Sequence, residues 1–337
     1  MEHHAGRHRY AIVIAVAVLV LLGVAMVALD WGQVRMVLGQ ADWRLVFVAL
    51  VFTALSYGCL SYSFAVVSKT FGVGLDRGDL FELGFVSSTL NHLLTSGGTA
   101  GHSLRMLLIK RRGLPVRDVL AASLFHSMLN NLLLFILVPV GVVYLLTNHS
   151  LSGDAAIGVG AAAGVFLLLI VVVAAVFVVG TFRAAAMGLA GAAWRKVTHR
   201  DIEQQLQDLD SALARGIGAS RSRSTILVFL LVVADWAFGV AALGFCFAAL
   251  GYPIGPGVLL TGFSIGVVVG LLSMVPGGLG IQEGSMAAVY ALLGVPFEQA
   301  VLAAILFRAV YYLVPFLLSL SFYWRLLKRE GKFTPET

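Results

Sequence analysis

Six ionisable side chains lie within or beside long apolar stretches of this sequence. They are His102, Arg105, His126, Asp235, Glu283 and Arg308. A charge in the membrane interior is costly unless a partner or water neutralises it, so residues of this kind usually mark binding or transport sites. The chemistry open to them is ion pairing, phosphate binding and proton exchange.

The arginines and carboxylates allow different roles, and the sequence leaves each choice open. Arg105 and Arg308 could grip a phosphate bidentately, whereas Arg105, close to the basic run at 110–117, could instead meet anionic lipid head groups. Glu283 and Arg308 could contact a substrate or form a purely structural ion pair. Asp235 could exchange a proton or cap a neighbouring helix.

The histidines do not predict a metal site. His92, His102 and His126 surround one segment, but their spacing matches no regular ligand pattern, so neither zinc nor another cofactor is expected. For His126 an interhelical hydrogen bond is favoured over a ligand role. Four further polar residues are interpreted as packing residues, namely Asn130, Asn131, Tyr311 and Tyr312.

A break in an apolar run organises the second half of the chain, where residues 275–284 read VPGGLGIQEG. The residues that oppose a continuous helix there are Pro276, Gly277, Gly278 and Gly280. We expect two half-helices joined by an irregular turn at membrane depth, which is tolerated only inside protein or beside a water-filled cavity. A helix beginning near Ile281 would direct free amides into the turn and favour an anion there. A kinked helix without a ligand is the alternative.

A second break lies in the first half of the chain. The apolar segment 80–94 is followed by TSGGTAG and then by residues 102–112. Each half is shorter than the roughly 20 residues that a helix needs to cross a bilayer. We therefore expect a re-entrant hairpin here, matching a second one within 257–291.

The composition identifies a polytopic membrane protein. Of 337 residues, 59% are hydrophobic and only 12% are charged, and the mean hydropathy is +0.94. The longest polar interval, about 195–224, is too short for an aqueous catalytic domain, and no P-loop, HExxH or CxxC motif occurs, so no enzyme is predicted. Cys59 and Cys246 lie in apolar segments and are interpreted as small core residues.

The hydropathy pattern predicts an all-α protein with one membrane domain over 1–337. Six full crossings are expected, at 10–29, 43–67, 116–146, 155–181, 226–250 and 297–324, in addition to the two broken hairpins. The linker 183–222 is predicted to be cytoplasmic and amphipathic, with a helix over 194–213 that lies on the membrane surface or is solvated. Basic clusters at 7–9, 110–117, 183–223 and the C-terminus place both termini in the cytoplasm.

An internal repeat relates the two broken segments. GLPVRDVLAASLFHSMLNNLL, from Gly113, aligns with GVPFEQAVLAAILFRAVYYLV, from Gly294, with one inserted residue. His126 then occupies the position of Arg308. The repeat units span 43–146 and 224–325, and the single crossing between them gives them opposite orientations. Broken segments in corresponding positions of inverted repeats indicate a transporter's binding site near the midplane.

At these motifs the chain resembles the lysylphosphatidylglycerol synthase transmembrane region, a flippase-like family. VPGGLGIQEG followed by AAILFRAVYYLVP is similar to the family signature, and NHLLTSGGTAGHSLR resembles its first-half motif. The match places Asn91, Gly101 and Arg105 in register. It departs at His102, where the family commonly has Glu, and the turn lacks the family's proline. The resemblance implies lipid translocation, with relatives acting on aminoacylated phospholipids or other lipid-linked molecules.

Together these observations predict a multipass inner-membrane protein that moves a lipid between leaflets. The expected partner is a membrane lipid with an anionic or zwitterionic head group, and no nucleic acid partner is expected. Two alternatives remain open: a secondary transporter of a small polar solute, and a non-transporting accessory subunit of a lipid-modifying enzyme.

The charge placement predicts that residues 147–154 and 251–257 face the outside of the cell. Single cysteines at Asn148 and Gly255, in a Cys59/Cys246-free background, should react with an impermeant thiol reagent added to intact cells. Reaction only after permeabilisation would reverse the orientation.

Overall fold

The computed structural model describes Gly39 and residues 41–94, 99–112, 115–148, 153–198, 202–219, 223–273 and 275–330. Within these residues every regular element is a helix, which confirms the prediction of an all-α protein. Residues 43–337 form one unit, and the description is confined to it. The predicted crossing at 10–29 lies outside the described residues, so the total of six stays a prediction.

The elements are α3 (Trp43–Thr70), α4 (Arg77–Leu94), α5 (Thr99–Arg111), α6 (Val116–Asn148), α7 (Gly153–Val178), α8 (Gly180–Thr198), α9 (Glu203–Ala219), α10 (Arg223–Ala249), α11 (Pro256–Leu272), the short 3₁₀ turn η1 (Pro276–Gly278), α12 (Ile281–Leu292), α13 (Phe297–Arg308), the π-helical turn η2 (Ala309–Leu313) and α14 (Val314–Glu330).

Four helical stretches in the described ranges are long and apolar enough to cross a membrane. They are α3, α6, α10 and the stretch Phe297–Lys328, which joins α13, η2 and α14. They coincide with four of the predicted crossings. A fifth results if α7 and α8, which meet at a bend of 94°, count as one span.

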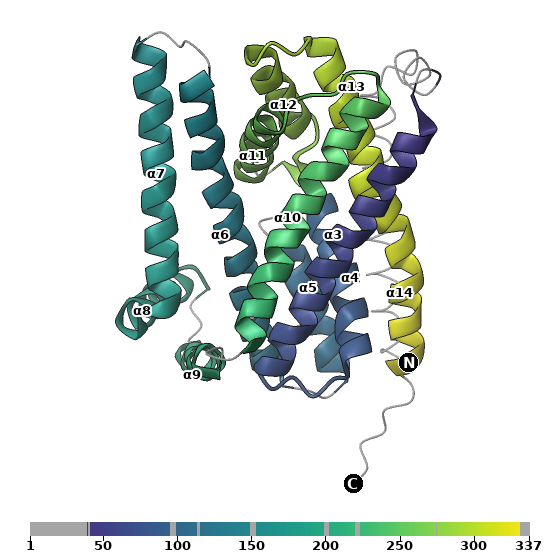
Figure 1. Cartoon of the computed structure of the whole chain (residues 1–337). Helices are drawn as coiled ribbons and strands as arrows, with labels where there is room; N and C mark the ends of the chain where they lie inside the picture. The colour runs from purple at the N-terminus through teal and green to yellow at the C-terminus, as the bar shows by residue number, and fades with distance from the viewer. Residues whose placement is uncertain are drawn as a thin grey trace. The chain divides into compact units, whose positions relative to one another are not determined.

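The centre of the unit is the interface between α3 and α10, which lie side by side in Figure 1. Small side chains are buried on both helices, including Ala49 and Ser56 on α3 and Gly239 and Ala242 on α10. Small residues let two membrane helices approach closely, which compensates for the missing hydrophobic driving force between them. These two helices therefore form the support for the rest of the unit.

The two broken segments pack against spans from the opposite half of the chain. In the first half, α4 packs on α14, and in the second half, α11 packs on α6. Figure 1 shows α4 and α5 toward one end of the unit and α11 and α12 toward the other.

The helix expected over 194–213 is wrong in its bounds. Trp194 belongs to α8, whereas the apolar repeat lies in α9, which begins only at Glu203. The buried face of α9, including Leu209 and Leu213, packs with Phe71 and Phe125 near the ends of α3 and α6. The bend between α7 and α8 separates α8 from the span before it, and α9 is held by its packing on the ends of α3 and α6.

Gly262 of α11 is a position where shape decides stability. A Cβ atom there would lie 2.2 Å from the ring of Tyr290, whose hydroxyl donates a 2.9 Å hydrogen bond to the Leu259 carbonyl. We predict that Gly262→Val destabilises the purified protein by about 1–3 kcal/mol through overpacking. Unfolding in detergent measures this, with Gly158→Val as control because a Cβ at Gly158 meets nothing within 4 Å. Equal stability of the two variants would contradict the α11–α12 packing.

Candidate functional site: a polar cavity between the broken helices

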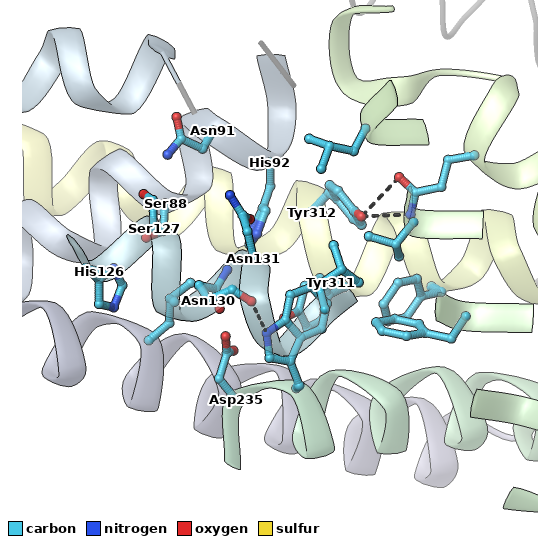
Figure 2. Close-up of a pocket in the computed structure, with 18 of the residues that line it drawn as sticks. Ser88, Asn91, His92, His126, Ser127, Asn130, Asn131, Asp235, Tyr311 and Tyr312 are labelled. Atoms are coloured by element: carbon cyan, nitrogen blue, oxygen red, sulfur yellow. Dashed lines mark hydrogen bonds between the residues drawn. The ribbon is translucent and has the colours of Figure 1, made fainter. Parts of the chain in front are cut away.

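A cavity of about 140 Å³ lies between the two broken segments and the central helices (Figure 2). Side chains from both halves of the chain line it, on α3 to α6 and on α10 to α13 together with η2. Its polar lining includes Asn91, Arg105, His126, Asn130, Asp235 and Gln282. Its aromatic lining consists of Trp236, Phe263, Phe307, Tyr311 and Tyr312. In Figure 2, Asn130, Asp235 and Tyr311 extend into the same space.

The second broken segment turns through three left-handed glycines. Gly277, Gly278 and Gly280 have φ angles of 67°, 59° and 78°, which favour glycine over any residue with a Cβ. The turn ends where α12 begins at Ile281, as the sequence predicts.

The two broken segments meet at Gly277. A Cβ there would lie 2.7 Å from the carbonyl oxygen of Leu93, near the C-terminal end of α4. A glycine is therefore required for the turn of one hairpin to touch the end of a helix in the other.

Glu283 and Arg308 hold this turn together. The Glu283 carboxylate accepts the Gly280 backbone N–H at 2.8 Å, which caps the first turn of α12. The same carboxylate forms an ion pair with Arg308, whose guanidinium lies 4.9 Å from the ring centroid of Tyr312. Both side chains retain some exposure, 15% and 18%, and neither lines the central cavity.

Arg105 is the most deeply buried charge of the cavity, with 2% of its surface exposed. Its Nε donates a 2.6 Å hydrogen bond to Ser87, and its guanidinium lies 3.8 Å from the ring centroid of Phe64. Its Nη1 has no hydrogen-bond partner and no carboxylate pairs with it among the described residues. The site therefore contains a fixed cation with an available donor, which suits an anionic oxygen.

Asn91 and Gly101 hold the α5 helix that carries Arg105. The Asn91 side-chain oxygen accepts the Gly101 backbone N–H at 2.6 Å, which satisfies one of the free amides in the first turn of α5. A Cβ at Gly101 would lie 2.5 Å from the Ser87 carbonyl oxygen. This glycine thus allows α5 to lie against α4 and keeps Arg105 beside Ser87.

Each of the three histidines pairs with a hydroxyl. His126 Nε2 lies 2.7 Å from Ser63, His92 Nδ1 lies 2.7 Å from Tyr57, and His102 Nε2 lies 3.3 Å from Ser127. His92 and His126 line the cavity, and His102 does not. In the described part of the chain no group of three metal-ligating side chains occurs.

Asp235 lies on α10, faces the cavity and is 4% exposed. Ser56 of α3 donates a short hydrogen bond to its Oδ1. The Ser56 oxygen also lies 2.6 Å from the hydroxyl of Tyr311 on η2. The carboxylate is thus connected to helices of both halves, and no cation pairs with it among the described residues.

The structure brings together only part of the predicted site. Asn91, Arg105, His126 and Asp235 line one cavity, whereas Glu283 and Arg308 form a pair beside it. Gly277, Gly278 and Gly280, with Pro276 in η1, form the turn.

Sequence reasoning misses other residues of the site. Tyr311, Tyr312, Asn130 and Asn131, which the sequence suggests are packing residues, line the cavity, and so does Gln282. Ser56 does not line it but bonds to Asp235. The sequence does carry one signal for Ser56: it lies seven residues before Ser63, so both serines lie on one face of a membrane helix. In the structure, Ser56 bonds to Asp235 and Ser63 to His126.

A sequence profile of the family described as "Lysylphosphatidylglycerol synthase TM region" matches residues 10–319. The chain belongs to this family. Among similar proteins of the family, the UPF0104 membrane protein of Pyrococcus horikoshii is 21% identical over 320 residues, which cover 89% of this chain and 94% of that protein. A UPF0104 membrane protein of Methanothermobacter thermautotrophicus is 21% identical over 315 residues, covering 90% and 91%.

A shorter match to a UPF0104 membrane protein of Methanothermobacter thermautotrophicus is 29% identical over 98 residues, and here the chain spans only 28% of the relative. The family and the apolar helices establish a multipass membrane protein of the lysylphosphatidylglycerol synthase TM and UPF0104 type.

The Glu283–Arg308 ion pair should contribute to the free energy of unfolding. Arg308→Met should destabilise the protein by up to about 3–5 kcal/mol because it leaves a half-buried carboxylate without its counter-charge. The double variant Glu283→Gln/Arg308→Met should be more stable than Arg308→Met alone, since both charges are then absent. Unfolding by SDS titration measures the difference, and a double variant no more stable than Arg308→Met would contradict the pairing.

Proposed function

We propose that this protein moves a phospholipid or another lipid-linked molecule between the leaflets of the membrane. The observation that carries the proposal is the central cavity, in which the buried guanidinium of Arg105 has a free donor and no carboxylate partner among the described residues. Phosphate is the anionic group shared by most membrane lipid heads, and Arg is suited to bind it.

The head group would be held between the two broken segments while the acyl chains remain in lipid. Broken helices are tolerated at membrane depth where they line a cavity, and they are typical of transporter binding sites. The contact of Gly277 with the Leu93 carbonyl supports this role, because a shift of either hairpin changes the boundary of the cavity.

We further propose that residues 43–146 and 224–325 are inverted repeats related by an axis in the membrane plane. Reciprocal packing supports the relation: α4 of the first unit contacts α14 of the second, and α11 of the second contacts α6 of the first. The corresponding helices α3 and α10 contact each other. In such a pair, access from the two sides alternates when one unit moves relative to the other.

The proposed location is the inner membrane with both termini in the cytoplasm. One end of the unit gathers basic residues: Arg112 pairs with Asp79 and reaches the Leu326 carbonyl, and Arg325 pairs with Glu82. Tyr144 of α6 lies against Gly257 of α11, which brings the C-terminal end of α6 and the N-terminal end of α11 together, next to the weakly charged stretches of the sequence. The positive-inside rule then places the basic end in the cytoplasm.

Arg105→Gln tests the function. Loss of a charge-assisted hydrogen bond worth about 1.5–3 kcal/mol should slow translocation of a fluorescent phospholipid in proteoliposomes by about 10- to 100-fold. Lys110→Gln is the matched control, because it removes one positive charge from an exposed position on the same helix. Thermal unfolding in detergent shows whether the variants fold.

Native mass spectrometry of the wild-type protein should detect a co-purified lipid that is lost in Arg105→Gln and partly retained in Arg105→Lys. Wild-type translocation rates in a folded Arg105→Gln protein would refute the proposed site.

A further inference from the structure

The central cavity is lined by a second buried ionisable group, Asp235, in addition to Arg105. Along α3, Ser56 bonds to Asp235 and Phe64 stacks on Arg105, and these two residues are eight positions apart. At 1.5 Å per residue the α3 residues that hold the two groups are about 12 Å apart along the helix, which sets the scale of the separation between the groups. Neither forms an ion pair among the described residues, so each is the principal uncompensated charge near the other.

The hydrogen bonds around Asp235 have a defined direction. A serine hydroxyl carries a single proton, and Ser56 donates it to Asp235 Oδ1. In the 2.6 Å contact between Ser56 and Tyr311 the tyrosine must therefore be the donor. Both hydroxyl protons of this hydrogen-bond chain therefore point toward the carboxylate of Asp235. The second carboxylate oxygen, Oδ2, is the atom that can gain or lose a proton.

This hydrogen-bond chain joins three helical elements of the proposed transporter. Asp235 lies on α10, Ser56 on α3 of the other half, and Tyr311 on η2, the π-helical turn after Arg308. Gly239, one turn after Asp235 on α10, makes room for Tyr311, since a Cβ there would lie 3.2 Å from the tyrosine hydroxyl. A change at the carboxylate is thus transmitted directly to the contact between the two halves.

Other titratable groups surround Asp235. His92 on α4, Arg105 on α5, His126 on α6 and Tyr312 on η2 line the cavity. On α3, Tyr57 packs against Tyr311 and bonds to His92, and Cys59 follows Ser56 by three residues; neither lines the cavity. The residues of α11 and α13 that line the cavity are apolar, and Arg308 is paired with Glu283 outside it. Arg105 is the permanent cation among them, so its charge stabilises the ionised form of Asp235.

We propose that Asp235 is a proton-binding site coupled to the anion at Arg105, so that a phosphate-bearing head group and a proton occupy the cavity together. This proposal rests on the proposed function and adds its coupling ion. An anion bound to Arg105 cancels the positive charge that favours the carboxylate, and Asp235 then takes one proton from cavity water to become a neutral acid. No other bond forms or breaks, and the proton is returned to water when the head group leaves.

Electrostatics sets the size of the coupling. Over about 12 Å, with an effective dielectric constant of about 20, cancelling one unit charge changes proton affinity by about tenfold. Linkage is reciprocal, so protonation of Asp235 strengthens anion binding by the same factor. The bound state is then electrically balanced, which lowers the cost of moving a phosphate through the membrane interior.

The test measures proton uptake on binding, with purified full-length protein in weakly buffered detergent, a pH indicator and soluble dihexanoyl phosphatidylglycerol as the probe. The wild-type protein should take up protons as it binds the probe, and its affinity should rise by up to about tenfold as the pH is lowered. Asp235→Asn, which keeps an oxygen for Ser56, should bind the probe without proton uptake and without pH dependence. Asp208→Asn, which removes a carboxylate from an exposed position on α9, is the control and should behave as the wild type does.

Two further measurements guard against an unfolded variant and identify the source of the anion. Gly239→Ala keeps the carboxylate but crowds Tyr311, and it should weaken the coupling while proton uptake remains measurable. Inorganic phosphate, tested in place of the lipid, should produce little uptake.

The outcomes separate the two proposals. Probe binding without proton uptake in the wild type, or uptake that persists in Asp235→Asn, would overturn the coupling and leave lipid translocation standing. Uptake with inorganic phosphate but not with the lipid probe would keep the coupling and refute the lipid function. No binding of either anion would refute both.

Discussion

The structure depends on the cost of placing a charge or an unpaired backbone group where there is little water. The described residues contain two responses to this cost. Glu283 and Arg308 neutralise each other, and Glu283 also satisfies the Gly280 amide that the broken helix exposes. Arg105 and Asp235 instead have only uncharged hydrogen-bond partners and share a cavity. The first response stabilises the turn, and the second leaves two buried charges without a counter-charge among the described residues, which is the basis of the proposed binding site.

The glycine turn has a structural role that differs from direct ligand binding. Positive φ angles at Gly277, Gly278 and Gly280 reverse the chain, and the absence of a Cβ at Gly277 lets the turn touch the Leu93 carbonyl. The end of one broken helix thereby supports the turn of the other. A Cβ at position 277 would collide with the Leu93 carbonyl, so the glycine determines how closely the two hairpins approach, while residues on α5 and α10 supply the charges of the cavity.

The sequence predicted most of the helices because hydropathy and length are strong, local signals, and it located the break before Ile281 because proline and glycine act on the backbone directly. It also selected Arg105 and Asp235, since a charge in an apolar run is conspicuous. It could not decide that Arg308 pairs with Glu283 outside the cavity, because that depends on the direction of side chains after the π turn. Ser56 was missed because a serine in a membrane helix is common, and only its contact with Asp235, 179 residues away, distinguishes it.

The π turn explains how one short segment serves both halves of the chain. In η2 the Val314 amide bonds to the Ala309 carbonyl, five residues back, which accommodates an extra residue in the span that begins at α13. The consecutive side chains Tyr311 and Tyr312 then reach in different directions: Tyr311 bonds to Ser56 of α3, and Tyr312 bonds to Gln282 of α12 at 2.9 Å. Arg308, just before the turn, holds Glu283. A regular helix would rotate these residues relative to their present partners. The turn therefore links the first half of the chain, the second broken segment and the cavity, because adjacent tyrosines connect α12 to the hydrogen bonds at Asp235.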